Sequence, residues 1–192
     1  MVNKLIGVLA LQGDFAEHVG LLRSCGYRCQ EVRNIHDLDA SDALVIPGGE
    51  STAIIKLIDR WALREPLVKR IESGMPVFGT CAGAIILARA SSDGEAPLGV
   101  LDISVTRNAY GRQTESFEAE VASPHFDGAL KGAFIRAPVI TDVPPQVEVL
   151  AEYGGDPVLV RKDHLLASTF HPEIAGETRV HRFFLEVVCS SN

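Results

Sequence analysis

The sequence lacks the features that would place the protein in a membrane, outside the cell or on nucleic acid. It has no run near the ~18 apolar residues of a membrane span, and its four cysteines are too few for a disulfide framework. The start, residues 1–4, does not resemble a secretion signal. Lys and Arg number 18 against 25 Asp and Glu, with no basic cluster to attract a phosphate backbone. We therefore expect a cytoplasmic protein with free thiols that binds neither nucleic acid nor membrane.

The composition is that of a globular domain. Hydrophobic residues make up 46% of the 192 positions and charged residues 22%, and a domain of such a length buries roughly 70% of its unfolded surface. No linker, repeat or low-complexity segment divides the chain. We expect a single domain over residues 1–192 whose core needs neither disulfide nor metal.

Apolar runs alternate with helical patterns in the first half of the chain. The run 5–11 is typical of a strand covered on both faces, and apolar residues recur at helical spacing from 15 to 22. Further strands are predicted at 28–32, 43–46 and 77–78, and further helices from Ser51 (as N-cap) through Ile58, at 65–71 and at 84–90. The alternation predicts a flavodoxin-like, three-layer α/β/α fold with a mostly parallel, doubly wound sheet.

The second half of the chain has a different pattern of secondary structure. Short strands are predicted there at 100–107, 116–121, 134–135, 147–151, 158–161 and 165–169. Hairpin turns are expected at 153–156 and 162–164, so some of these strands should pair antiparallel. The segment 179–188 has the pattern of a closing amphipathic helix.

The sequence Gly79-Thr80-Cys81-Ala82-Gly83 has the spacing of a nucleophile elbow between a predicted strand and a predicted helix. The glycines allow a sharp turn that lifts Sγ above the carboxyl edge of the sheet. The helix N-terminus there favours a thiolate, the nucleophilic form of cysteine. The alternative is a small buried side chain at a tight turn, and the strand-helix context favours catalysis.

His171-Pro172-Glu173 follows a predicted strand, and a two-residue step along an extended segment points both side chains the same way. A carboxylate on one imidazole nitrogen fixes the tautomer and leaves the other nitrogen free to exchange a proton with a thiol. Alone, this short motif would fit a capping or core histidine. Together with the elbow it predicts a Cys81-His171-Glu173 triad.

Pro47-Gly48-Gly49-Glu50-Ser51 follows another predicted strand, so its loop should reach the same edge of the sheet as Cys81. The amides of Gly49 and Ala82 could then stabilise an oxyanion, an effect worth about 3 kcal/mol per donor. A simple glycine turn before a helix is the compatible alternative. A phosphate loop is disfavoured because the Gly-Lys-Ser/Thr ending is missing.

The remaining candidates are weaker. Arg107 and Arg136, each near the end of a predicted strand, could bind a carboxylate or form ordinary ion pairs. Cys25 and Cys29 lack a second ligand pair for a metal, and we predict none. The five other histidines belong to no comparable constellation, so structural or solvated roles are expected for them.

Three ordered motifs at 47–52, 79–83 and 170–173 resemble those of triad glutamine amidotransferases. Within that class, 10–14, 107–113 and 134–138 are similar to the glutaminase subunits of pyridoxal 5′-phosphate synthase, over about residues 4–188. The resemblance implies hydrolysis of L-glutamine through a glutamyl thioester on Cys81, without a cofactor. It also implies that the glutamine pocket is lined by Gly49, Glu50, Ser51, Arg107, Ile135 and Arg136.

The resemblance further implies a partner, a separate (β/α)₈-barrel synthase subunit that receives the ammonia in a hetero-oligomer. Because a free glutaminase would waste glutamine, we expect activity to depend on that partner, with the loops 12–14 and 48–50 near the docking face. Two rival interpretations are a γ-glutamyl peptidase-like hydrolase and a redox sensor built on Cys81. The redox sensor would need neither His171-Pro172-Glu173 nor the second glycine loop.

Overall fold

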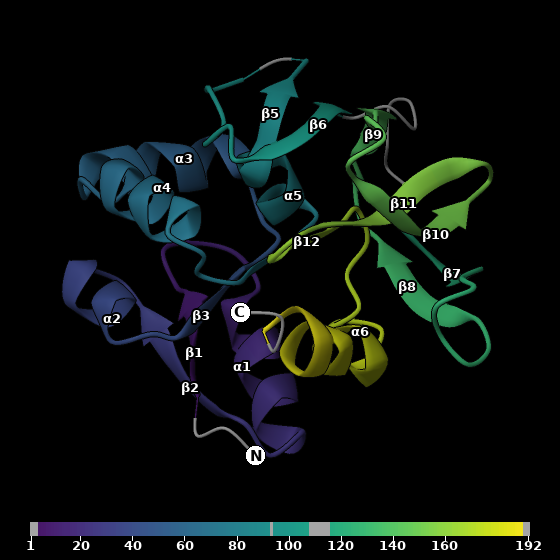
Figure 1. Ribbon diagram of the computed structural model, residues 1–192, viewed down its shortest axis with the longest axis horizontal. Helices are drawn as coiled ribbons and strands as arrows, with labels where there is room; N and C mark the ends of the chain where they lie inside the picture. Colours follow the sequence, from purple (N-terminus) through teal and green to yellow (C-terminus); the bar gives the residue numbers. More distant parts are fainter. Residues whose placement is uncertain (1–3, 93, 108–115, 190–192) are drawn as a thin grey trace.

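Seven strands form the central sheet of the protein, in the order β10-β11-β12-β4-β3-β1-β2 (Figure 1). The computed structural model describes residues 4–92, 94–107 and 116–189. Five neighbouring strands are parallel, and the last two, β11 and β10, are added antiparallel at one edge. The strands of this sheet are β1 (Leu5–Leu9), β2 (Arg28–Val32), β3 (Ala43–Ile46), β4 (Val77–Thr80), β10 (Glu148–Tyr153), β11 (Asp156–Lys162) and β12 (Leu165–Ser168).

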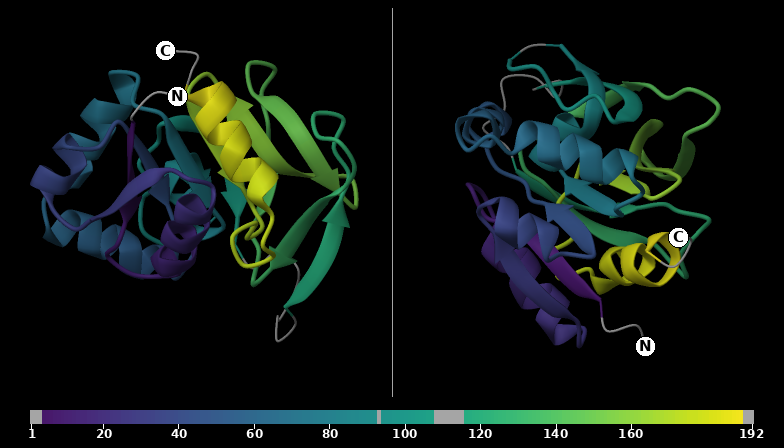
Figure 2. Two further views of the ribbon diagram at one scale, coloured as in Figure 1. Left: turned by 90° about the horizontal axis from the view of Figure 1, so that it is seen from below. Right: turned by 60° about the vertical axis from the view of Figure 1, so that its left-hand side comes forward.

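Helices cover both faces of the sheet, which gives three layers (Figures 1 and 2). One face carries α3, α4 and α5, and the opposite face carries α1 and α6. The short α2 follows β2 at the edge of the sheet. The helices are α1 (Phe15–Ser24), α2 (Ile35–Asp39), α3 (Ser51–Arg60), α4 (Arg64–Glu72), α5 (Ala82–Leu87) and α6 (Thr178–Phe183), the last continuing as a π-helical turn, η1 (Phe184–Val188).

Alternation along the strands divides the core into two layers, one on each face of the sheet. In β3, Leu44 and Ile46 belong to the cluster that includes α3 and α4, whereas Ala43 and Val45 belong to the cluster that includes α1 and α6. Since successive side chains of a strand point to opposite faces, an all-apolar strand is what a doubly covered sheet requires. The apolar runs of the sequence therefore correspond to the central strands.

Two smaller sheets extend the second half of the chain. Strands β5 (Ala88–Ser91), β6 (Leu101–Thr106) and β9 (Val139–Asp142) form one, and β7 (Phe117–Val121) pairs with β8 (Leu130–Phe134) in the other. Antiparallel hairpins connect β10 to β11 and β11 to β12. The predicted α/β/α fold with antiparallel additions is thus confirmed.

Two local predictions were wrong, and two elements were not predicted. The helix predicted at 84–90 ends at Leu87, because Ala88 turns to an extended conformation and pairs with Leu101 of β6. Ser51 is not the N-cap of α3; Glu50 is, and its carboxylate accepts from the amides of residues 52 and 53. Helix α2 and strand β9 were not predicted from the sequence. Among the described residues, no helix is long and apolar enough to cross a membrane.

Candidate active site

The candidate site lies at the carboxyl ends of four neighbouring parallel strands, β12, β4, β3 and β1. The segments that leave these strands bring together His171, Cys81, the Gly48-Gly49 loop and residues 12–14. Parallel strands all present their carboxyl ends at one edge of a sheet, which is where ligands bind in open α/β folds. The topology therefore gathers residues that lie up to 159 positions apart in the chain, from Gln12 to His171.

Cys81 sits on a sharp turn between β4 and α5. Its backbone has φ 48° and ψ −100°, a conformation that non-glycine residues rarely adopt. A Cβ at Gly79 would lie 2.6 Å from the backbone of Gly83, and a Cβ at Gly83 would lie 2.1 Å from the carbonyl oxygen of Ile46. Both glycines are required by close backbone packing, which is the geometry of a nucleophile elbow.

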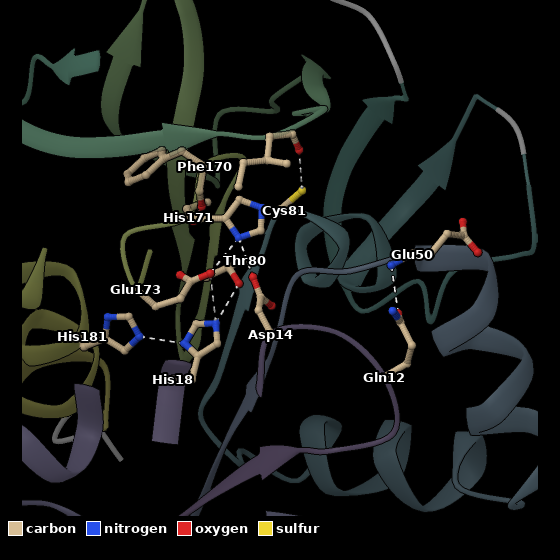
Figure 3. Close-up of polar contacts among 12 residues, drawn as sticks. Gln12, Asp14, His18, Glu50, Thr80, Cys81, Phe170, His171, Glu173 and His181 are labelled. Atoms are coloured by element: carbon tan, nitrogen blue, oxygen red, sulfur yellow. Dashed lines mark hydrogen bonds and ion pairs between the residues drawn. The ribbon is translucent and has the colours of Figure 1, made fainter. Parts of the chain in front are cut away.

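His171 lies beside Cys81, and two carboxylates contact its other side (Figure 3). Its Nδ1 is 2.7 Å from Oε1 of Glu173 and 2.8 Å from Oδ2 of Asp14. The contact with Glu173 agrees with the sequence prediction, although residues 172–176 form a turn and not an extended segment. With Nδ1 engaged in this way, Nε2 is left for the thiol.

The charges in this group are strongly coupled. Burial opposes a charge on His171, but hydrogen bonds with Asp14, Cys81 and Glu173 outweigh it and raise the pKa of the imidazole well above its usual range. Burial raises the pKa of Glu173 to about 7. The pKa of Asp14 is lowered, because its contacts with His171 outweigh its partial burial. The site thus favours an imidazolium with a carboxylate beside it.

Behind Glu173 lies a buried chain of polar groups that the sequence analysis missed. Nε2 of His18 is 3.5 Å from Oε1 of Glu173 and 3.0 Å from Oγ1 of Thr80, and its Nδ1 is 2.9 Å from Nε2 of His181. Burial lowers the pKa of His18 well below its usual range and that of His181 to about 4, so both rings are neutral at pH 7.

We assign the ring protons of this group from the carboxylate oxygen of Glu173 beside Nε2 of His18, which favours a proton on that nitrogen. A neutral His18 that donates from Nε2 toward Thr80 and Glu173 must accept at Nδ1 from His181. In this assignment Nδ1 of His181, which has no hydrogen-bond partner among the described residues, carries no proton, so no buried N–H is left unpaired there. The ring N–H groups of His181 and His18 then both donate in the direction of the Glu173 carboxylate.

A pocket of about 790 Å³ opens above the elbow, a suitable size for a small-molecule ligand. Gln12, Asp14 and Ile174 also line it. Of the predicted site residues, all except Glu173 line the pocket: Gly49, Glu50, Ser51, Cys81, Ala82, Arg107, Ile135, Arg136 and His171. Glu173 is buried behind His171, as a residue that orients the ring should be.

Arg107 forms an ion pair inside this pocket. Its guanidinium donates to Oε1 of Glu50 at 3.1 Å and to Oγ1 of Thr52 at 3.1 Å. Of the two alternatives left open by the sequence, an ion pair is therefore the one present in this structure. Residues 108–113, which extend the resemblance, lie outside the described residues.

The Gly48-Gly49 loop is held by the segment that follows β1. The side-chain oxygen of Gln12 accepts from the amide of Glu50 at 2.9 Å, and the amide of Asp14 donates to the carbonyl oxygen of Gly48 at 3.3 Å. Because C=O and N–H of a trans peptide point in opposite directions, this second contact also fixes where the amide of Gly49 points. Segment 12–14 thus controls one of the two predicted oxyanion donors.

In the part of the chain that the structure describes, two groups of side chains have the composition of metal ligands, His18-Glu173-His181 and Asp14-His171-Glu173. Both consist of groups already joined by the hydrogen bonds described above. Hydrogen bonding alone accounts for their proximity, and the prediction that the site uses no metal stays a prediction.

A cysteine lies on a strained elbow above a parallel sheet, with a histidine beside it and carboxylates on that histidine. This is the arrangement of a candidate Cys-His-carboxylate triad, a class of site that catalyses acyl transfer through a thiol nucleophile. Comparison with known proteins narrows this class. The model of the SNO glutamine amidotransferase family matches residues 8–190, and the chain belongs to that family.

Similar proteins and solved structures agree with this family assignment. The pyridoxal 5′-phosphate synthase subunit PdxT of Mycolicibacterium vanbaalenii is 50% identical, covering 94% of this chain and 95% of its own; that of Pelotomaculum thermopropionicum is 51% identical, covering 94% and 93%. A crystal structure of a glutamine amidotransferase superimposes with a TM-score of 0.91 at 47% identity, over 96% and 98% of the two chains. The structure of PurLQS from Thermotoga maritima, 15% identical with a TM-score of 0.69, over 95% of this chain and 97% of its own, shares the fold.

Proposed function

We propose that the protein is the glutaminase subunit of a cytoplasmic pyridoxal 5′-phosphate synthase. It hydrolyses L-glutamine to L-glutamate and ammonia and supplies the ammonia to a separate (β/α)₈-barrel subunit. The observation that carries the proposal is the strained Cys81 elbow beside His171, whose Nδ1 is held by a carboxylate 2.7 Å away. Relatives about half identical over almost their whole length are named as subunits of that synthase, which supports it.

In the first half of the reaction, Sγ of Cys81 attacks the carboxamide carbon of glutamine. His171, which holds the proton of the thiol as an imidazolium, gives a proton to the nitrogen as the C–N bond breaks, so ammonia leaves and a γ-glutamyl thioester remains. Glu173 orients the ring and stabilises the imidazolium until this transfer. The developing oxyanion is bound by the amides of Gly49 and Ala82.

In the second half, water replaces ammonia as the nucleophile. His171 removes a proton from the water, which attacks the thioester carbon, and the proton then returns to the departing sulfur of Cys81. The products are glutamate and the free thiol. No step requires a metal or an organic cofactor, because the electron pair and the proton are both carried by this pair of side chains.

Glutamine is recognised in this proposal by the groups that surround the elbow. Arg107 and Glu50, whose ion pair spans one side of the pocket, present opposite charges to the α-carboxylate and α-ammonium of the substrate. Ser51, Ile135 and Arg136 complete the lining. Sγ of Cys81 lies 3.7 Å from the carbonyl oxygen of Ile135, which follows β8, and this distance supports a role for Ile135 beside the reacting carboxamide.

Activity depends on the partner because ammonia released into water would be protonated or lost. In our proposal the loops 12–14 and 48–50 lie near the docking face, and docking sets the Gly48-Gly49 peptide so that the amide of Gly49 completes the oxyanion hole. The contact between the amide of Asp14 and the carbonyl oxygen of Gly48 supports this link. Equal glutaminase rates with and without the barrel subunit would contradict partner gating.

The test is reconstitution with the barrel subunit of a pyridoxal phosphate synthase in the presence of its sugar-phosphate substrates. With glutamine as nitrogen source, formation of pyridoxal phosphate should require this chain, whereas with an ammonium salt the barrel subunit should act alone. A γ-glutamyl peptidase-like hydrolase, the rival with the same fold, would release no ammonia from free glutamine and would leave the barrel subunit without nitrogen. That outcome would overturn the proposal.

A further inference from the structure

Asp14 has a position that the triad chemistry does not explain. Its Oδ2 lies 2.8 Å from Nδ1 of His171, the same nitrogen that contacts Glu173 at 2.7 Å (Figure 3). One imidazole nitrogen carries one proton and can donate one strong hydrogen bond. A triad needs one carboxylate at this nitrogen, and the structure supplies two from different segments of the chain.

The ordinary role of an aspartate at this position is absent. Asp14 is the N-cap residue of α1, where Asp normally accepts a hydrogen bond from the first turn of its helix, but its side chain makes no capping bond. Its second oxygen, Oδ1, is buried and has no hydrogen-bond partner in the described part of the chain. Helix capping therefore does not account for the position of the carboxylate, whereas His171 does.

The backbone around Asp14 is arranged so that the carboxylate can reach the ring. The loop at Gly48 passes so close to His171 that a Cβ there would lie 2.2 Å from Cε1 of the imidazole and 3.1 Å from Oδ2 of Asp14. Only a residue without a side chain fits at this point. The imidazole edge, the carboxylate and the loop that carries Gly49 are thus packed into one unit.

From this geometry we infer that Asp14 is a second positioning residue for His171, able to hold the imidazole by Nδ1 in place of Glu173. The inference rests on the proposed function, since it gives Asp14 a part in the same site. Asp14 acts through His171 and makes no contact with the reacting atoms in this account.

Because their environments differ, the two carboxylates are charged over different ranges of pH. Glu173 is fully buried, and burial raises its pKa to about 7, so it becomes neutral as the pH falls below 7. The side chain of Asp14 is 16% exposed and its pKa is lowered by His171, so it stays charged. Within the described residues, the other ionisable groups that face this cluster are Cys81 from the elbow, His18 from α1 and His181 from α6, and both of these histidines are neutral.

The test is a double-mutant cycle on glutamine hydrolysis in the presence of the barrel subunit, with Asp14→Asn, Glu173→Gln and the double variant. Both substitutions preserve side-chain shape. If either carboxylate can hold the ring, each single variant should lose about 10-fold in kcat/KM and the double variant about 10³- to 10⁴-fold, as when a triad loses its only orienting carboxylate. Glu17→Gln, which removes an exposed charge from the first turn of α1, is the matched control.

The pH profile provides a readout that a structural role would not change. In Asp14→Asn only Glu173 remains to hold the ring, so the acidic limb of the pH profile of kcat/KM should move toward neutral pH. If Glu173→Gln does not fold, this measurement alone tests whether Asp14 positions His171. Losses that simply multiply in the double variant, or an Asp14→Asn profile identical to that of Glu17→Gln, would overturn the inference. A wild type without glutaminase activity would instead contradict the proposed function.

Discussion

The amide nitrogen of Cys81 donates a hydrogen bond of 2.8 Å to the carbonyl oxygen of Ser168. Ser168 is the last residue of β12, three positions before His171, and the next strand in the sheet is β4, which leads to the elbow. The proposed nucleophile and the proposed base are therefore fixed to adjacent strand ends. The sheet, and not a flexible loop, sets the distance between them.

The elbow should be intolerant of a methyl group. Gly83→Ala places a Cβ against the carbonyl oxygen of Ile46. Because that oxygen and the Gly83 Cα both belong to buried backbone that cannot easily move, we expect a loss of more than about 3 kcal/mol of stability. Gly20→Ala, in α1 with no atom within 4 Å of the new Cβ, should instead stabilise by about 0.5–1 kcal/mol. Urea denaturation of the two variants measures the contrast, and equal stabilities would show that the elbow can relax.

Arg107→Ala should weaken substrate binding more than it slows the chemical step. Loss of a charge-assisted hydrogen bond costs about 1.5–3 kcal/mol, so KM for glutamine should rise about 10- to 100-fold while kcat changes much less. Steady-state kinetics with the barrel subunit measures this. Arg89→Ala is the control, because its ion pairs with Asp102 and Asp142 lie outside the pocket; similar effects of the two substitutions would contradict the assigned role of Arg107.

Stability should depend on pH through the buried histidines. The pKa of His181 is about 4 in the folded protein and 6.5 in the unfolded chain, so the unfolded chain binds the extra proton between these values. The contribution of His181 to the free energy of unfolding is complete above pH 6.5, and it falls by on the order of 3 kcal/mol as the pH falls to 4. Glu173, whose pKa is raised to about 7, acts in the opposite direction between pH 4.5 and 7.

A variant isolates the histidine's contribution. The difference in unfolding free energy between wild type and His181→Gln should shrink as the pH is lowered from 7 to 4, since the wild type alone loses this stability. His36→Gln, on the exposed face of α2, is the matched control because this ring is not buried. A constant difference for His181→Gln would mean that the pKa of this ring is the same in the folded protein as in the unfolded chain, so that burial does not lower it.

The layered fold and most strand positions could be predicted because burial on two faces leaves continuous apolar runs. The strands at 28–32 and 43–46 match the structure at both ends. The end of the helix at 84–90 could not be predicted, because apolar residues there suit a buried helix as well as a strand. Only the pairing of Ala88 with Leu101 decides between them.

The predicted site residues could be found because each motif follows a strand and parallel strands end together. Asp14, His18 and His181 were not found, since none lies in a motif that points to chemistry. What joins them to Glu173 and His171 is the packing of α1 and α6 on one face of the sheet, which places residues 163 positions apart at 2.9 Å. Contacts of this kind arise from the tertiary structure and leave no local pattern in the sequence.

The central claim, that Cys81 is the nucleophile, is tested most directly by ammonia release from L-glutamine, measured for the wild type and Cys81→Ala with and without the barrel subunit. The account predicts strong activity for the wild type with its partner and a loss of at least about 10⁴-fold for Cys81→Ala. Equal rates for the two proteins would contradict it.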